Sequence, residues 1–182
     1  MRKTGFNILF WGFLFDMIDF RINNFDILPD IIGHILFLIG LLSLASYSVY
    51  FNKAKNYSVA MVALSIFGLF QGTNVGIGTN TRITIGVTLL LVIAALIVYL
   101  LLLYNIFMGI KDLATTQQIG EIYDEADKRW VQFIWLQILI IPAFIIMFIP
   151  LINLIYVVAL LIANIVLAIN IMKLMKRCEQ LL

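Results

Sequence analysis

The chain has 182 residues, of which 63% are hydrophobic and 12% are charged, and its formal net charge is +2. A water-soluble domain averages roughly 45–50% apolar and about 25% charged residues, so this composition argues against a soluble fold. It indicates an all-α helical bundle embedded in a membrane, because helices satisfy their own backbone hydrogen bonds in lipid. The small net charge gives no reason to expect a nucleic-acid partner, and the length fits one transmembrane domain over 1–182.

Six apolar segments follow one another along the chain, and about 20 apolar residues are needed for a helix to cross the hydrocarbon. The polar run Asn52–Asn56 (NKAKN) is expected to form a turn, and Gly72–Asn80 (GTNVGIGTN) a loop. Pro150 and Asn153 mark a very tight connection between the last two segments, which either both span or form a re-entrant pair. The expected spans are 6–20, 28–51, 58–72, 83–110, 131–149 and 151–172.

Lysine and arginine residues indicate the orientation, because the cytoplasmic loops of membrane proteins carry an excess of both. With six spans and cytoplasmic ends, ten of the 12 cations fall on the cytoplasmic side and only Arg21 and Arg82 fall outside. We therefore predict a multi-pass protein of the plasma membrane with both termini in the cytoplasm. The ten cytoplasmic cations are Arg2, Lys3, Lys53, Lys55, Lys111, Lys128, Arg129, Lys173, Lys176 and Arg177.

Residues 111–130 form the one long polar connection, and their apolar positions recur at helical spacing. Asp124–Lys128 and Glu125–Arg129 have the i,i+4 spacing that stabilises a helix. We expect an amphipathic helix on the cytoplasmic face, which is either a docking surface for a cytosolic partner or a solvated connector.

Small residues spaced by four occur at Gly68, Gly72 and Gly76, and again at Ala159 and Ala163. This spacing lets helices approach closely, either in an oligomer interface or inside the bundle.

No catalytic motif is visible, since H-E-x-x-H, G-x-S-x-G and a Walker loop are all missing from the sequence. The single histidine, His34, restricts any metal site to mostly oxygen ligands, and we expect no cofactor and no metal. The single cysteine, Cys178, excludes an intrachain disulfide. It is expected beside the inner membrane surface, as an acylation site or an inert thiol.

Polar chemistry concentrates between the first two segments, where Asp16–His34 reads DMIDFRINNFDILPDIIGH. On a helix, Asp16, Asp19 and Asn23 share one face, while Asp30 and His34 share a face of the next helix. If the two segments pair as a hairpin, both faces meet near the outer boundary of the membrane. The candidate site therefore comprises Asp16, Asp19, Arg21, Asn23, Asp26, Asp30 and His34.

Three interpretations of this cluster compete. In a structural role, Arg21 neutralises acids while Asp26 and Asp30 cap the second segment. In a transport role, carboxylate and amide oxygens hold a cation or relay a proton, since acids within a span often mark such paths. In a recognition role, the cluster docks a partner membrane protein or an external ligand, with Arg21 as an anion anchor.

The run Phe20–Leu41 (FRINNFDILPDIIGHILFLIGL) resembles the "FDILPDxIG"-type element of small multi-span membrane proteins from low-GC Gram-positive bacteria. The resemblance covers about the first quarter of the chain and implies a bacterial membrane protein, without implying an activity. In size alone, the chain also looks like the substrate-binding subunits of energy-coupling-factor vitamin transporters. Its first segment lacks their A-x-x-x-A docking element.

The sequence thus favours a non-enzymatic, membrane-embedded binding or accessory subunit that uses the outer polar cluster. The alternative is a small protein that translocates ions or solutes, coupled to protons or cations or acting as a transporter's substrate-binding subunit. A membrane hydrolase using Asp30 and His34 is a third class, for which the sequence places no nucleophile. The expected partners are the lipid bilayer and a partner membrane protein or a second copy of the chain.

Overall fold

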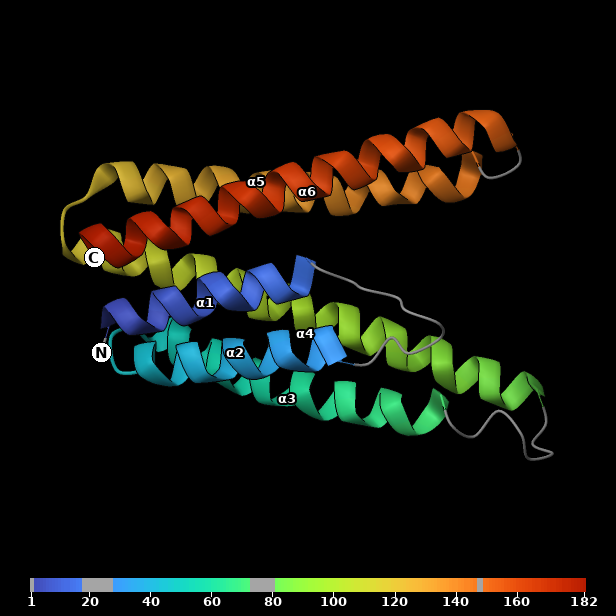
Figure 1. Cartoon of the computed structure of the whole chain (residues 1–182), viewed down its shortest axis with the longest axis horizontal. Helices are drawn as coiled ribbons and strands as arrows, with labels where there is room; N and C mark the ends of the chain where they lie inside the picture. The colour runs from blue at the N-terminus through green and yellow to red at the C-terminus, as the bar shows by residue number, and fades with distance from the viewer. Residues whose placement is uncertain (1, 18–27, 73–80, 147–148) are drawn as a thin grey trace.

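The computed structural model describes residues 2–17, 28–72, 81–146 and 149–182, which are almost entirely helical (Figure 1). Short turns at 45–48 and 117–119 interrupt the helices. No strand occurs among these residues, so the described chain is all-α, as the composition predicts. The helices are α1 (Arg2–Met17), α2 (Leu28–Leu44), α3 (Val49–Gly72), α4 (Thr81–Thr116), α5 (Gly120–Ile146) and α6 (Pro150–Leu181).

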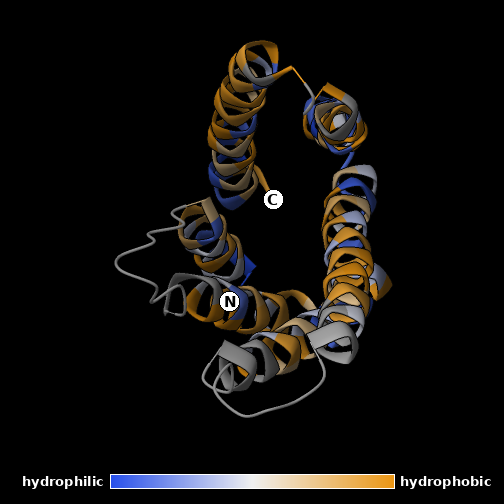
Figure 2. Cartoon of the chain, turned by 90° about the vertical axis from the view of Figure 1, so that its right-hand side faces the viewer, coloured by the Kyte–Doolittle hydropathy of each residue, from blue (hydrophilic) through white to orange (hydrophobic). Residues whose placement is uncertain are grey.

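Consecutive helices run in opposite directions, so both termini and the α2–α3 and α4–α5 turns lie together (Figure 1). We call this the terminal end and the opposite one the loop end. Each helix packs against its neighbours in sequence, and α1 also packs against α6. The six helices therefore form a closed ring when viewed along their axes (Figure 2).

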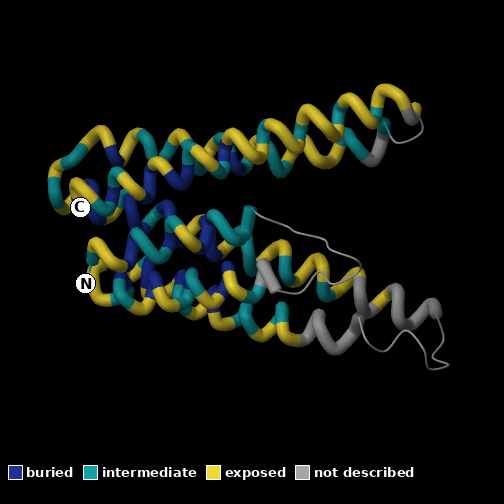
Figure 3. The backbone as a smooth tube through the Cα atoms, viewed as in Figure 1, coloured by how far each residue is buried: buried dark blue, intermediate teal, exposed yellow. Residues whose placement is uncertain are grey.

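The buried core lies toward the terminal end of the ring, whereas the loop-end halves of α4, α5 and α6 are largely exposed (Figure 3). Aromatic rings dominate this core. Phe6 meets Phe51 edge-to-face at a centroid distance of 6.1 Å, and Phe13 meets Phe37 at 4.8 Å. Apolar packing thus holds the helices together at one end and leaves much apolar surface bare at the other.

Two described segments, Leu89–Thr116 and Leu151–Leu181, are long and apolar enough to cross a membrane. Only 22% and 6% of their most apolar stretches are buried in this chain. A core helix of a soluble protein would be mostly covered, so these bare faces indicate association with a membrane. Ile31–Leu44 is a shorter apolar helix.

The boundary between α2 and α3 differs from the expected one. The expected segment 28–51 is interrupted at residues 45–48, and the run Asn52–Asn56 lies inside α3, so the turn predicted there is wrong. Ser48 explains the new boundary, because its Oγ accepts a hydrogen bond from the Tyr50 N–H at 3.2 Å, as an N-cap serine does. Polar residues such as Asn and Lys do not by themselves end a helix.

The expected connector 111–130 is also divided, since α4 continues to Thr116 and α5 begins at Gly120. The Ile119 N–H donates to the Ala114 carbonyl at 2.9 Å, and the Gln118 N–H donates to the Thr115 carbonyl at 3.1 Å. Gln118 has φ 58°, so this turn is a Schellman-type C-cap with a non-glycine residue in the left-handed position. The amphipathic pattern continues on both sides of the turn, which is why the sequence did not reveal the break.

Replacing Gln118 by glycine is expected to raise the free energy of unfolding by about 1 kcal/mol, because glycine adopts positive φ without the Cβ clash. The matched control is Thr116→Gly, two residues earlier in the helical part of α4, where glycine should cost about 1 kcal/mol. Unfolding in mixed detergent micelles, followed by circular dichroism, compares the two. Equal destabilisation by both substitutions would contradict the cap.

Candidate functional site

The candidate residues are only partly covered by the described structure. Asp16 lies in the last turn of α1, and His34 lies in the second turn of α2. Asp30 is described as backbone in the first turn of α2. The remaining candidates, Asp19, Arg21, Asn23 and Asp26, lie outside the described residues.

Asp16 is held by a tyrosine that is distant in the sequence. The Tyr99 hydroxyl, from the middle of α4, donates a hydrogen bond to Asp16 Oδ2 at 2.5 Å. A hydrogen bond to a carboxylate is stronger than one between neutral groups, so this contact fixes the end of α1 to α4. The Tyr99 ring in turn contacts Phe133 of α5, with centroids 6.3 Å apart.

His34 is held by two serines of α3. Its side chain lies 3.2 Å from Ser65 Oγ through Nδ1, and its backbone carbonyl accepts a hydrogen bond from Ser58 Oγ at 3.2 Å. The Ser65 hydroxyl donates its single proton to the Met61 carbonyl at 2.9 Å. With that proton engaged, Ser65 Oγ accepts from Nδ1–H of His34, and in the neutral imidazole this arrangement leaves the lone pair on Nε2.

The Nε2 atom of His34 is buried and has no hydrogen-bond partner among the described residues. His34 as a whole is only 6% exposed. Buried polar atoms in membrane proteins nearly always find partners, because none is available from lipid. The Nε2 lone pair is therefore a position where a hydrogen-bond donor would be stabilised.

The part of α1 that carries Asp16 and the part of α2 that carries His34 approach each other through backbone contact. A Cβ added at Gly33 would lie 3.2 Å from the Asp16 backbone nitrogen and 3.4 Å from the Gly12 carbonyl oxygen. A larger residue at position 33 would require the α1 backbone to move by a few tenths of an ångström, so glycine favours this close approach. We call the resulting set of groups on α1 to α4 the polar layer; it consists of Asp16, His34, Ser58, Ser65 and Tyr99.

The glycines that allow this contact were missed in the sequence. Gly5 and Gly12 lie on α1, and Gly33 and Gly40 lie on α2, each pair spaced by seven residues. A Cβ at Gly40 would lie 3.0 Å from the Gly5 carbonyl oxygen. A search for small residues spaced by seven, in addition to four, would have found both pairs.

The polar layer gives a direct test of the Asp16–Tyr99 hydrogen bond. Tyr99→Phe is expected to lower the free energy of unfolding by about 1 kcal/mol, since the Asp16 carboxylate loses a donor inside the bundle. Tyr104→Phe is the matched control on the same helix, because the described residues offer the Tyr104 hydroxyl no hydrogen-bond partner. Equal stability of both variants would show that the hydrogen bond contributes nothing.

A second polar region lies at the terminal end. Arg177 of α6 donates to Glu121 at 2.9 Å and also to Glu125, both on α5. Glu125 forms the expected i,i+4 pair with Arg129 at 3.5 Å. The two Arg177 ion pairs join α6 to α5, and both of their acids lie in the segment 111–130 that the sequence assigned to a single connector.

Lys111 joins α4 to α5 at the same end, through Asp127 at 2.5 Å and through the Tyr123 ring at 4.6 Å from the centroid. Cys178 is fully buried, with 0% exposure, which favours the inert thiol over the acylation site.

Comparison with protein-family models, with curated proteins and with solved structures gives no match for this chain. The resemblance of Phe20–Leu41 to small Gram-positive membrane proteins therefore stays a prediction. Among the described residues, no group of three or more His, Cys, Asp or Glu side chains could hold a metal ion.

Proposed function

We propose that this protein crosses the plasma membrane six times, with both termini in the cytoplasm. The alternating helix directions support this topology, because they bring the ten cations assigned to the cytoplasm into helix segments near the terminal end (Figure 1). Exposed apolar side chains on every helix also support it. Examples are Trp11, Ile39, Val59, Leu90, Ile141 and Leu154.

We infer that the polar layer lies within the hydrocarbon. Tyr99 lies inside the apolar segment Leu89–Thr116 of α4, and its hydroxyl donates to Asp16 of α1, which supports a position at the same depth for both. The hydrocarbon is about 30 Å thick. α4, with 36 residues, extends beyond the bilayer, and its terminal-end part reaches the ion pairs of α5 and α6.

Within this topology we propose a non-enzymatic binding or accessory subunit whose recognition site is the outer side of the polar layer. The observation that supports this function best is the buried acceptor His34 Nε2 beside the α1–α2 contact. A partner helix or an external ligand that carries a hydrogen-bond donor would satisfy it.

Ion translocation is the second candidate. It is favoured by two titratable side chains, Asp16 and His34, that project into one layer of the bundle, with Tyr99 hydrogen-bonded to the first. Carboxylates and histidines inside membrane helices often form proton relays.

Cysteine labelling tests the topology. In a Cys178→Ser background, a cysteine at Asn74 should react with an impermeant maleimide added to intact cells. A cysteine at the exposed Asp124 should react only after the membrane is opened. The reverse labelling pattern would contradict the proposed orientation. Equal labelling of the two cysteines would contradict the placement of these two positions on opposite sides of the membrane.

Two measurements separate the candidate functions. A photo-reactive residue at the exposed Ile35, next to His34, should cross-link to one discrete protein in native membranes, and His34→Gln should remove that product. The same residue at the exposed Leu96 is the control for random collisions. Purified protein in liposomes with a pH-sensitive dye should show no proton flux. Flux that Asp16→Asn abolishes, while Asp124→Asn retains it, would favour translocation instead.

A further inference from the structure

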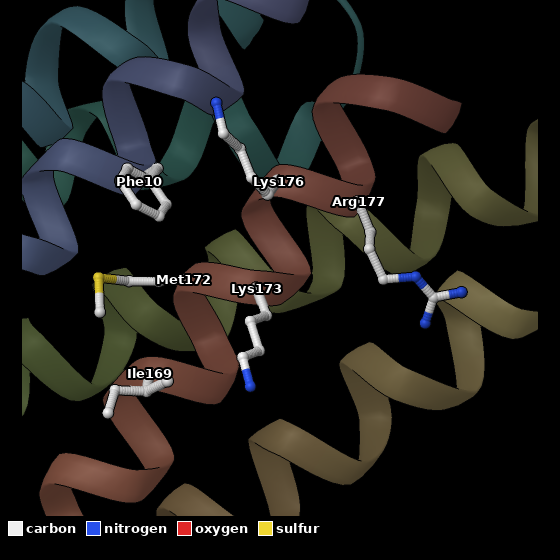
Figure 4. A pocket seen from close by; sticks show the side chains of 6 residues that line it. All are labelled: Phe10, Ile169, Met172, Lys173, Lys176 and Arg177. Atoms are coloured by element: carbon white, nitrogen blue, oxygen red, sulfur yellow. The ribbon is translucent and has the colours of Figure 1, made fainter.

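An open groove of about 510 Å³ lies between α1 and α6 near the terminal end (Figure 4). Its lining combines three apolar side chains with three cations. The residues are Phe10 of α1 and Ile169, Met172, Lys173, Lys176 and Arg177 of α6. No carboxylate contributes to this lining.

The groove continues as an apolar stripe on the membrane-facing surface of α6. Ile162, Val166 and Ile169 are 55%, 52% and 39% exposed. Together with Lys173 and Lys176 they are spaced by four, three, four and three residues, which places all five on one face of the helix. A stripe of exposed apolar side chains therefore leads directly to two lysines.

The three cations of the groove differ in how far acidic side chains already compensate their charge. Arg177 donates to Glu121 and Glu125, so its charge is already compensated. Lys176 reaches Glu179 on its own helix at 2.9 Å and lies 5.6 Å from the centroid of the Phe10 ring. Lys173 is exposed and pairs with no acid among the described residues. An exposed i,i+3 ion pair contributes little, so Lys176 can leave Glu179. Lys176 and the uncompensated Lys173 can therefore both turn toward an anion in the groove.

We propose that this groove binds an anionic phospholipid, with its phosphate between Lys173 and Lys176 and an acyl chain along the stripe of α6. A lysine has an apolar stem and a charged tip, which suits this boundary between hydrocarbon and headgroup. Lysines near the membrane surface attract anionic lipids. A free phosphate would use the lysines but leave the apolar stripe bare, so the combination favours a lipid.

Under the proposed topology the terminal end faces the cytoplasm, so the groove would take its lipid from the cytoplasmic leaflet; this part rests on the proposed function, whereas the binding itself does not. If cysteine labelling contradicted the topology, the protein in detergent could still bind the lipid. The lipid site could also fail while the labelling pattern holds, so the two proposals are tested separately.

Native mass spectrometry of the purified full chain in a neutral detergent tests the site. Phosphatidylglycerol is titrated against phosphatidylcholine with the same acyl chains. The wild-type protein should retain phosphatidylglycerol preferentially, and each of Lys173→Gln and Lys176→Gln should weaken its affinity about fivefold. The double variant should show no preference between the two lipids.

The matched control is Lys53→Gln with Lys55→Gln, which removes the same charge from α3 at the terminal end. It should keep the wild-type preference. Equal retention of the two lipids by the wild type, or equal loss in the control, would overturn the site. Glycerol phosphate binding as tightly as the lipid would overturn the role of the apolar stripe. Because both lysines are exposed, circular dichroism should show all variants folded.

Discussion

Replacing Phe51 by alanine is expected to lower the free energy of unfolding by about 3 kcal/mol. The side chain is fully buried, meets the Phe6 ring at 6.1 Å, and lies against Gly109 of α4. Phe51 thus joins α1, α3 and α4 inside the ring of helices. Its removal leaves an apolar cavity inside the bundle, which stays dry, so the lost dispersion contacts are not replaced.

Unfolding by added SDS in mixed micelles, followed by circular dichroism, measures the effect. Trp135→Ala is the aromatic control, because this side chain is 62% exposed and its loss should cost less than about 1 kcal/mol. A Cβ at Gly109 would lie 2.6 Å from Phe51 Cε1. Gly109→Ala should therefore be harmful in the wild type and harmless in the Phe51→Ala background. Equal cost in both backgrounds would refute the contact.

Gly40→Ala is expected to destabilise the protein by about 2 kcal/mol. The new Cβ would lie 3.0 Å from the Gly5 carbonyl oxygen and 3.0 Å from side-chain carbons of Leu9. Because one of these atoms belongs to the backbone of α1, the contact can be relieved only by moving the two helices apart.

Gly86→Ala on α4 is the matched control, since no atom lies within 4 Å of its added Cβ. The higher helix propensity of alanine should leave its stability unchanged or raise it by about 0.5–1 kcal/mol. The same SDS titration distinguishes the two variants by the sign of the change. If Gly40→Ala proves as harmless as Gly86→Ala, close α1–α2 packing is wrong.

The all-helical architecture could be predicted because hydropathy is a local property. A helix in lipid needs a run of apolar residues and a polar break, and both are readable along the chain. The α2–α3 boundary was predicted wrongly because the sequence analysis placed the break at the polar run Asn52–Asn56, whereas Ser48 caps α3 before that run. The Ser48 side chain also donates to Asp112 Oδ2 at 2.5 Å, and a partner 64 residues away leaves no signal in the local pattern.

In the candidate site, too, the contacts between residues that are distant in the sequence could not be predicted. Its acids and histidine were identifiable as ionisable groups in an apolar context. Their partners were not, since Tyr99 and Ser65 look like ordinary residues of apolar helices. The hydrogen bonds to Asp16 and His34 connect residues 83 and 31 positions apart.

The sequence by itself determined the helical class and the clustering of lysine and arginine at alternate ends of the apolar segments. Both depend on the free energy of transferring each residue from water to lipid, and these free energies add up along the chain. It also identified Asp16–His34 as the stretch in which polar residues are concentrated between apolar segments. Only the tertiary structure decided that α1 closes the ring against α6, that Tyr99 and Ser65 hold Asp16 and His34, and that a basic groove forms beside Phe10. These features depend on how each helix is rotated about its axis. That rotation is set by packing at positions such as Gly5, Gly33 and Gly40, where close contact between two helices is a joint property of both.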